Sequence, residues 1–239
     1  GKSSNDLLDE AEAKIFELST NRANADSLKK IDNYVKETWD RLEELSGLEG
    51  ELIGVSSGFQ AVDGLTQGLQ KEDLIVIAGR PSMGKTALAM NIVENVAKKN
   101  EGCVAVFSLE MSSQSLTQRM LASMAGISQS NVKSANLTDR QWDKIAKQTK
   151  NMNDLNIFVD DTPNISPMEI RAKSRRLAKQ FRNSGGLNLV VIDYIQLMQM
   201  PGRNENRVNE LSDISRSLKY LAKEVKAPVI VLSQLNRGV

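Results

Sequence analysis

The residues with the most specific chemistry form a glycine-rich turn between an apolar run and an expected helix. Residues 79–86 fit the pattern G-x-x-x-x-G-K-[ST], with apolar residues 74–78 before them and a helical stretch at 87–97 after them. In such a loop, backbone N–H groups point at a phosphate beside a helix N-terminus that already favours anions. An ordinary glycine-rich strand-to-helix turn is the alternative. The residues predicted to bind nucleotide phosphates are Gly79, Arg80, Pro81, Ser82, Met83, Gly84, Lys85, Thr86 and Ala87.

Two side chains of this loop and one distant carboxylate predict a magnesium site. In loops of this pattern the lysine, here Lys85, reaches the β- and γ-phosphates, and the hydroxyl of Thr86 can bind Mg²⁺. Asp193 ends the apolar run 189–192, and a carboxylate at the end of a buried strand can hold the hydrated Mg²⁺ that Thr86 also touches. Capping of a following helix is the alternative role for Asp193. We expect Thr86 and Asp193 to be the metal ligands.

Three further residues are candidates for catalysis at the γ-phosphate or for sensing it. Glu110 follows the strand expected at 103–109, where it can orient the attacking water or accept its proton; helix capping is the alternative. Gln234 follows the last apolar run, where a neutral amide can sense the γ-phosphate; otherwise it is a surface glutamine. Arg119 lies two to three helical turns beyond Glu110, where it can approach the γ-phosphate or brace Glu110; otherwise it is a solvated helix arginine.

These residues need a scaffold, and the apolar pattern predicts a parallel sheet. Short, nearly continuous apolar runs suit strands that are buried on both faces, and the segments between them favour helices. Thr138 with Gln141 and Ser166 with Glu169 have the spacing of helix capping boxes. Strands that alternate with helices predict an α/β doubly wound domain, which binds ligands at the carboxyl ends of its strands. The expected strands lie at 74–78, 103–107, 155–159, 189–192 and 229–232.

The charge distribution separates an N-terminal part from the rest of the chain. The formal net charge of the chain is +1, but residues 1–50 carry 7 basic and 12 acidic side chains. The pattern predicts a helix within residues 1–20, then a polar linker and an amphipathic helix within 21–50, and the nucleotide-binding core over 51–239. The first helix packs on the main body or docks on another subunit; the residues alone leave this open. The densest basic cluster favours a solvated helix face and consists of Arg171, Lys173, Arg175, Arg176, Lys179 and Arg182.

Composition excludes several classes of site. The chain has no histidine and a single cysteine, Cys103, so Ser-His-Asp triads, Cys-His dyads and imidazole zinc sites are excluded, as is an internal disulfide. No apolar run approaches the length of a membrane span, and the first residues are too polar for a signal peptide. We expect a cytoplasmic protein with no membrane partner.

Several sequence blocks together resemble DnaB-family replicative helicases. The blocks are Phe107-Ser108-Leu109-Glu110-Met111, Val191-Ile192-Asp193-Tyr194-Ile195-Gln196-Leu197 and Leu232-Ser233-Gln234-Leu235-Asn236-Arg237-Gly238-Val239. Residues 158–163, followed by 170–177, are also similar to that family. The resemblance implies a RecA-like P-loop core in a hexameric ring, with ATP and Mg²⁺ between subunits and single-stranded DNA in the central channel. It also implies a helicase loader and a primase as partners.

Carried to this chain, the resemblance makes Glu110 the catalytic base, Gln234 the sensor and the helix within 1–20 the linker helix that docks on a neighbour. The polar loop after Asp193 contains Arg203 and Arg207, which we expect to contact DNA phosphates; a mobile surface loop is the alternative. Because the blocks end at Val239, before the family's second DNA loop and its trans-acting arginine, we expect this chain alone to bind ATP but hydrolyse it poorly. Two other functions stay open: a RecA-like ATPase without unwinding, and a nucleotide-gated assembly or loader-docking module.

Overall fold

In the computed structural model the described residues fall into two units, one with residues 30–46 and 52–53 and one with residues 54–99, 101–199 and 207–235. The helix predicted within residues 1–20 lies outside the residues that the structure describes. Among the described residues, no helix has the length and apolar character needed to cross a bilayer. The described residues are 30–46, 52–99, 101–199 and 207–235.

The second unit alternates strands and helices along the chain, as the apolar pattern predicts. The strands are β1 (Leu74–Gly79), β2 (Cys103–Ser108), β3 (Ile157–Asp160), β4 (Leu187–Asp193) and β5 (Val229–Gln234). The helices are α3 (Gln60–Thr66), α4 (Lys85–Lys99), α5 (Ser113–Ala125), α6 (Gln129–Ser134), α7 (Asp139–Asn153), α8 (Pro167–Gln180) and α9 (Arg207–Val225), with a 3-10 turn η1 (Ile195–Leu197). In the first unit, α2 spans Asp32–Ser46.

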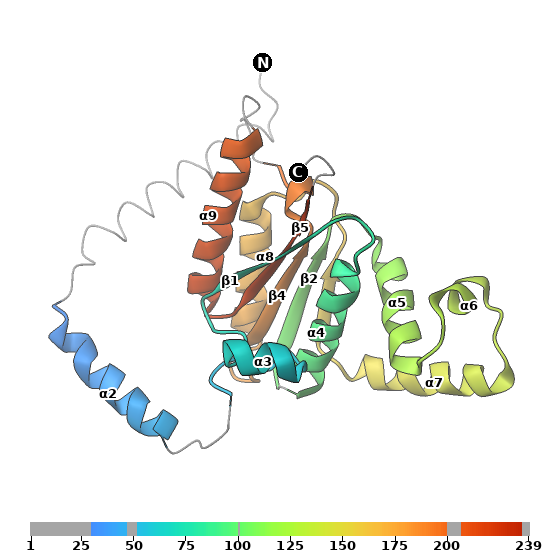
Figure 1. Ribbon diagram of the computed structural model, residues 1–239, viewed down its shortest axis with the longest axis horizontal. Helices are drawn as coiled ribbons and strands as arrows, with labels where there is room; N and C mark the ends of the chain where they lie inside the picture. Colours follow the sequence, from blue (N-terminus) through green and yellow to red (C-terminus); the bar gives the residue numbers. More distant parts are fainter. Residues whose placement is uncertain (1–29, 47–51, 100, 200–206, 236–239) are drawn as a thin grey trace. The chain divides into compact units, whose positions relative to one another are not determined.

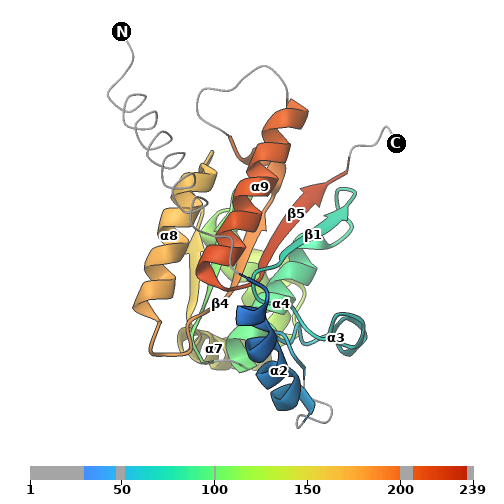
Figure 2. The same ribbon diagram turned by 90° about the vertical axis from the view of Figure 1, so that its left-hand side faces the viewer.

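The five strands form one parallel sheet in the order β1-β5-β4-β2-β3. Helix α4 covers one face, and α8 and α9 cover the other (Figure 1, Figure 2). This arrangement confirms the predicted doubly wound α/β fold. Because every strand runs the same way, all carboxyl ends meet at one edge, where β4 lies between β5 and β2.

Alternating residues of β4 build the two hydrophobic cores. Leu189 and Val191 pack with the α4 side, whereas Val190 and Ile192 pack with the α8 and α9 side. All four are fully buried, as expected for the central strand of a sheet that is covered on both faces. The apolar run that predicted this strand is therefore continuous because neither face of the strand meets water.

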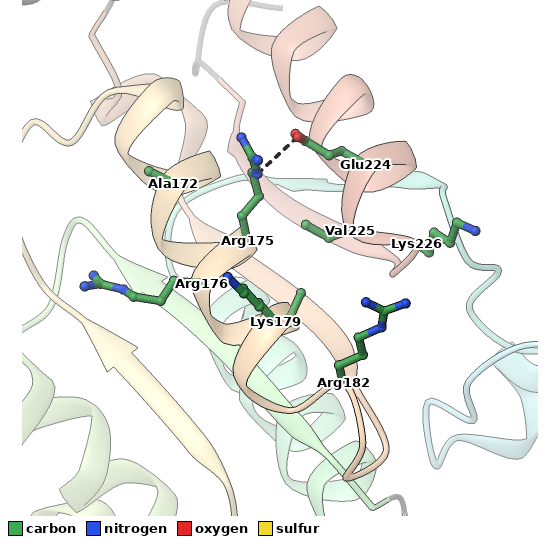
Figure 3. A pocket seen from close by; sticks show the side chains of 9 residues that line it. Ala172, Arg175, Arg176, Lys179, Arg182, Glu224, Val225 and Lys226 are labelled. Atoms are coloured by element: carbon green, nitrogen blue, oxygen red, sulfur yellow. Dashed lines mark ion pairs between the residues drawn. The ribbon is translucent and has the colours of Figure 1, made fainter.

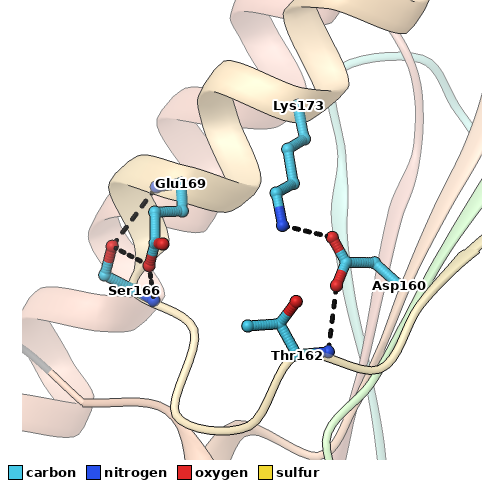
Figure 4. Close-up of polar contacts among 5 residues, drawn as sticks. All are labelled: Asp160, Thr162, Ser166, Glu169 and Lys173. Carbon is cyan, nitrogen blue, oxygen red and sulfur yellow. Dashed lines mark hydrogen bonds and ion pairs between the residues drawn. The ribbon is translucent and has the colours of Figure 1, made fainter.

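Both predicted capping boxes form. Ser166 accepts a hydrogen bond from the Glu169 N–H at 3.3 Å, and the Glu169 carboxylate accepts from the Ser166 N–H at 2.8 Å (Figure 4). At the start of α7 the Gln141 side chain accepts from the Thr138 N–H at 2.9 Å and forms the second box. One turn further along α8, Lys173 pairs with Asp160 at the end of β3 (Figure 4). These contacts fix where α8 leaves the sheet edge.

Helix α3 was not predicted, because its seven residues are too few for a periodic apolar signal. A buried carboxylate holds it: Asp63 accepts from the Ser57 N–H at 2.8 Å, the Ser57 hydroxyl at 2.7 Å and the Ser56 hydroxyl at 2.8 Å. Burial alone would raise the pKa of Asp63, but these hydrogen bonds outweigh it and lower the pKa below its ordinary value. The Asn95 amide of α4 donates to the Ser57 carbonyl at 3.0 Å and ties this segment to the core.

Helix α2 carries an apolar stripe along one side. Ile31, just before the helix, and Val35, Trp39 and Leu42 recur at intervals of three and four residues, so they share one face. Each of these side chains is more than half exposed. A stripe of this kind is typical of a helix that packs against another surface.

We predict that Leu189→Ala lowers the free energy of unfolding by about 2–5 kcal/mol, because it leaves a cavity in the central strand. Leu65→Ala is the matched control, since Leu65 is 90% exposed on α3 and its truncation should change stability by less than about 0.5 kcal/mol. Urea unfolding followed by circular dichroism measures both. Equal effects of the two substitutions would contradict the assigned core.

Candidate nucleotide site

The glycine-rich loop has the backbone of an anion-binding turn. It begins at the last residue of β1 and ends in the first turn of α4. Ser82 and Gly84 have positive φ angles of 62° and 84°, a conformation that turns successive N–H groups toward one side. Glycine suits position 84 because L side chains rarely adopt such an angle.

Lys85 lies over this loop and contacts its backbone. Its ammonium group donates to the carbonyl oxygens of Gly79 at 2.8 Å and Arg80 at 3.0 Å. Within the part of the chain that the structure describes, it forms no ion pair with an acidic side chain. Among the described residues this cation is held by carbonyl groups at a helix N-terminus, so it can exchange them for a phosphate, and the loop fits the predicted ligand.

The predicted metal ligands meet, although 107 positions separate them in the sequence. The Thr86 hydroxyl donates to Asp193 Oδ2 at 2.8 Å. Asp193 is only 2% exposed, and burial raises the pKa of its carboxyl group; Glu110 raises it further, whereas the bond from Thr86 and the charges of Lys85 and Arg119 lower it. A divalent cation would remove this destabilisation of the carboxylate.

The predicted ligands fit magnesium held together with a nucleotide better than a metal held by protein alone. In the described ranges, no three His, Cys, Asp or Glu side chains gather at one point. Mg²⁺ keeps several water ligands and is bound by one or two carboxylates and substrate phosphates. One hydroxyl and one carboxylate beside a phosphate loop are sufficient for that mode of binding.

Asp193 is not a helix cap. The turn η1 follows it, but the N-cap of η1 is Tyr194, which makes no side-chain capping bond. The alternative role for Asp193 is therefore wrong, and its buried carboxylate has Thr86 as its hydrogen-bond partner.

Glu110 lies near Asp193. The last residue of β2, Ser108, is in register with Asp193, and the Leu109 N–H donates to the Asp193 carbonyl at 2.7 Å. The negative charge of Glu110 contributes to the raised pKa values of both Asp193 and Tyr194. Glu110 itself is exposed, so its carboxylate can meet water.

Helix capping does not explain Glu110 either. Ser112 is the N-cap of α5, where its hydroxyl accepts from the Ser115 N–H. Asp161 supports the same helix end by accepting from the Ser113 N–H at 2.7 Å. The next helix therefore begins without Glu110.

Arg119 is half-buried rather than a fully solvated helix arginine. Among the residues that the structure describes, its Nε is buried and has no hydrogen-bond partner, and its charge lowers the pKa of Asp193. A buried donor without a partner is costly in a folded protein. The side chain therefore fits a site that receives an acceptor, which agrees with the predicted approach to a phosphate or to Glu110.

Gln234 is the last residue of β5 and lies in register with Gly79, where the phosphate loop begins. Its side chain is half-buried. Its backbone contacts the side-chain amide of Gln196, a residue that the sequence marks only as part of a longer motif. Its position three residues after Asp193 is the one feature of the sequence that could have marked Gln196 as part of the site.

Of the two residues predicted to contact DNA, the structure describes one. Arg203 lies outside the described residues. Arg207 begins α9 and ion-pairs with Glu210, and its Nη2 donates to the carbonyls of Gln196 at 2.7 Å and Met198 at 3.0 Å. Much of its guanidinium group is therefore used within the chain.

The basic cluster on α8 is partly neutralised. Arg171 and Arg175 both pair with Glu224 of α9, Arg175 at 3.2 Å, and Lys173 pairs with Asp160. A cavity of about 850 Å³ lies between the C-terminal ends of α8 and α9 (Figure 3). The remaining cations that line it are Arg176, Lys179, Arg182 and Lys226. Those on α8 and just after it are exposed, as predicted for a solvated face.

Comparison with known proteins agrees with this site. The family model described as DnaB-like helicase C terminal domain matches residues 54–239. Replicative DNA helicase DnaB of Geobacillus stearothermophilus is 47% identical over 234 residues, which cover 98% of this chain and 50% of that protein. Replicative DNA helicase DnaC of Bacillus subtilis is 44% identical over 235 residues, 98% of this chain and 51% of that protein. The chain thus spans about half the length of these curated relatives.

Solved structures show the same likeness. A helicase ATPase domain superposes with a TM-score of 0.79 at 32% identity, covering 88% of this chain and 73% of that one. A DnaB-like replicative helicase, studied for its interactions with primase, gives a TM-score of 0.77 at 32% identity, covering 93% of this chain and 53% of that one. These findings confirm the predicted RecA-like core. The chain belongs to the DnaB-like helicase C-terminal domain family.

Proposed function

We propose that this chain is the motor part of a replicative DNA helicase, which hydrolyses ATP to move along single-stranded DNA and separate the duplex. The observation that carries the proposal is the 2.8 Å contact between Thr86 and Asp193. It supports a site in which the glycine-rich loop and the carboxylate proposed to bind the metal lie together near Glu110. The relatives named replicative DNA helicases support the coupling to DNA. ATP and Mg²⁺ are the proposed substrate and metal.

Each side chain has one task in the proposed reaction. Lys85 exchanges its two carbonyl contacts for β- and γ-phosphate oxygens and so balances their charge. Thr86 and Asp193 hold the Mg²⁺, which supplies further charge stabilisation when bound. Glu110 accepts a proton from the attacking water, and Gln234 and Arg119 respond to the γ-phosphate.

The proposed assembly is a homo-hexameric ring in the bacterial cytoplasm, with a helicase loader and a primase as partners. The similar DnaB-like helicase interacts with primase, and the helicase relatives described above are bacterial. The helix predicted within residues 1–20 stays the proposed linker helix that docks on a neighbouring copy. Arg203 stays the proposed DNA-phosphate contact, and Arg207 would use only the donors that its own chain leaves free.

Lys85→Ala should weaken ATP binding about 100-fold and abolish strand displacement, because it removes charge-assisted hydrogen bonds of about 1.5–3 kcal/mol each. Lys147→Ala on α7 is the control, since Lys147 is exposed and distant in sequence from the loop. Calorimetric titration of the chain with Mg·ATP measures the affinity, and a forked duplex measures unwinding by the assembled enzyme that carries the same substitution. Strand displacement by the Lys85→Ala protein would rule out the proposed motor.

Glu110→Gln should lower the rate of ATP hydrolysis by about 10²–10⁴-fold with little change in ATP affinity, because the amide keeps the shape but accepts no proton. The assembled enzyme with single-stranded DNA is the system to measure. Unchanged turnover would remove Glu110 as the base and favour a nucleotide-gated assembly without hydrolysis.

Asp193→Asn should stabilise the metal-free protein by about 1 kcal/mol or more at neutral pH, since it removes a buried charge. The folded pKa of Asp193 is raised above 3.8, so its ionisation destabilises the fold above that pKa, and this effect is absent below the unfolded pKa. Mg·nucleotide should raise the urea midpoint of the wild type but not of the variant. A variant that is less stable and still responds to Mg²⁺ would contradict the metal assignment.

A further inference from the structure

The side chain of Gln196 binds the end of β5 through both halves of its amide. Its Nε2 donates to the Ser233 hydroxyl at 2.9 Å and to the Gln234 carbonyl at 3.1 Å, and its Oε1 accepts from the Gln234 N–H at 3.2 Å. One side chain thus pairs with the N–H and the C=O of one residue, as a neighbouring strand does. We propose that Gln196 is a positioning residue that fixes the γ-phosphate sensor Gln234 beside the phosphate loop, an inference that rests on the proposed function.

The end of β5 extends beyond its pairing with β4, and Gln196 contacts this end. Backbone pairing between β4 and β5 ends at Ile192 and Val231, whereas β5 continues to Gln234 and pairs with Gly79 of β1 on its other side. The last residue of β5 therefore lacks a strand neighbour on the β4 side. The amide of Gln196 supplies the missing donor and acceptor there.

The backbone of Gln196 is fixed by Arg207. Its backbone carbonyl accepts from Arg207 Nη2 at 2.7 Å, and the same nitrogen donates to the Met198 carbonyl at 3.0 Å. Arg207 is anchored at the start of α9 by its ion pair with Glu210. Backbone and side chain of Gln196 are both fixed, so the amide meets β5 in a preset position.

The contact joins the sensor to both halves of the site. On one side of β5, the Gly79 carbonyl accepts from the Leu235 N–H at 3.1 Å and from Lys85 at 2.8 Å. On the other side stands Gln196, three residues after Asp193. A change around the phosphate loop can therefore reach the end of β5 through the hydrogen bonds of the Gly79 carbonyl. A change at Asp193 can reach it through the three-residue step to Gln196, whose amide bonds Gln234.

The decisive comparison is between ATP and ADP binding. Gln196→Met keeps the length of the side chain and removes its polar atoms. We expect its affinity for Mg·ADP to stay within about 2-fold of the wild type, while its affinity for a non-hydrolysable Mg·ATP analogue falls about 10-fold, which corresponds to about 1.4 kcal/mol. Titration calorimetry on the purified chain measures both. Gln180→Met is the matched control, since Gln180 is exposed at the end of α8, and it should change neither affinity.

A second variant separates positioning from simple packing. Ionised glutamate at this position accepts hydrogen bonds but cannot donate to the Gln234 carbonyl, whereas protonated glutamic acid has one donor and one acceptor, as the amide does. For Gln196→Glu, we expect the preference for the ATP analogue over ADP, relative to the wild type, to recover as the pH falls from about 7 to about 4.5, where a glutamate of ordinary pKa begins to protonate. A preference that stays low at every pH would contradict the proposed pairing.

The outcomes distinguish the two proposals. Wild-type discrimination by Gln196→Met, or equal weakening of both nucleotides, would overturn the positioning role and leave the nucleotide site intact. If the wild-type chain bound Mg·ADP and the Mg·ATP analogue equally well, the positioning role would be overturned as well. Unaltered nucleotide binding by Lys85→Ala would instead contradict the proposed function, and the positioning role with it.

Discussion

One hydrogen bond joins the two halves of the proposed catalytic site, and most of the second unit serves to place it. Thr86 begins α4 and Asp193 ends β4, and the contact between them is 2.8 Å long. The first turn of α4 reaches β4 because α4 packs across the sheet face that Leu189 and Val191 share with it. Strand order then places β5 and β2 on either side of Asp193. The proposed sensor Gln234 ends β5, and the proposed base Glu110 lies two residues beyond the end of β2.

The same arrangement places polar groups in the site that lower the stability of the fold. Asp193 is almost fully buried, with Thr86 as its bonding partner and Glu110 as a nearby like charge. Arg119 carries a buried Nε donor that finds no acceptor among the described residues. Buried polar groups in this condition destabilise a protein, and functional sites commonly retain such groups because ligand binding satisfies them. The sole cysteine contrasts with them: burial raises the pKa of Cys103 to about 11, so it stays a neutral core side chain.

Local signals in the sequence predicted the scaffold and the central residues. Parallel strands buried on both faces give continuous apolar runs, and the capping boxes at Thr138 and Ser166 depend on residues only three positions apart. The phosphate loop is likewise one contiguous segment. The pairing of Gln196 with Gln234 and the anchoring of Arg207 join residues that are distant in the chain or fold back on it, and no local pattern marks such contacts. The roles of Arg203 and of the helix within residues 1–20 stay predictions, since both lie outside the described residues.

The most direct test of the central claim is a structure of this chain with Mg²⁺ and a non-hydrolysable ATP analogue. We predict the triphosphate in the loop that ends at Thr86, with the metal about 2.0–2.1 Å from the Thr86 hydroxyl and bound to Asp193 directly or through one water. Glu110 should face a water in line with the γ-phosphate. A triphosphate bound elsewhere, or a carboxylate of Asp193 or Glu110 that points away from it, would contradict the proposed site.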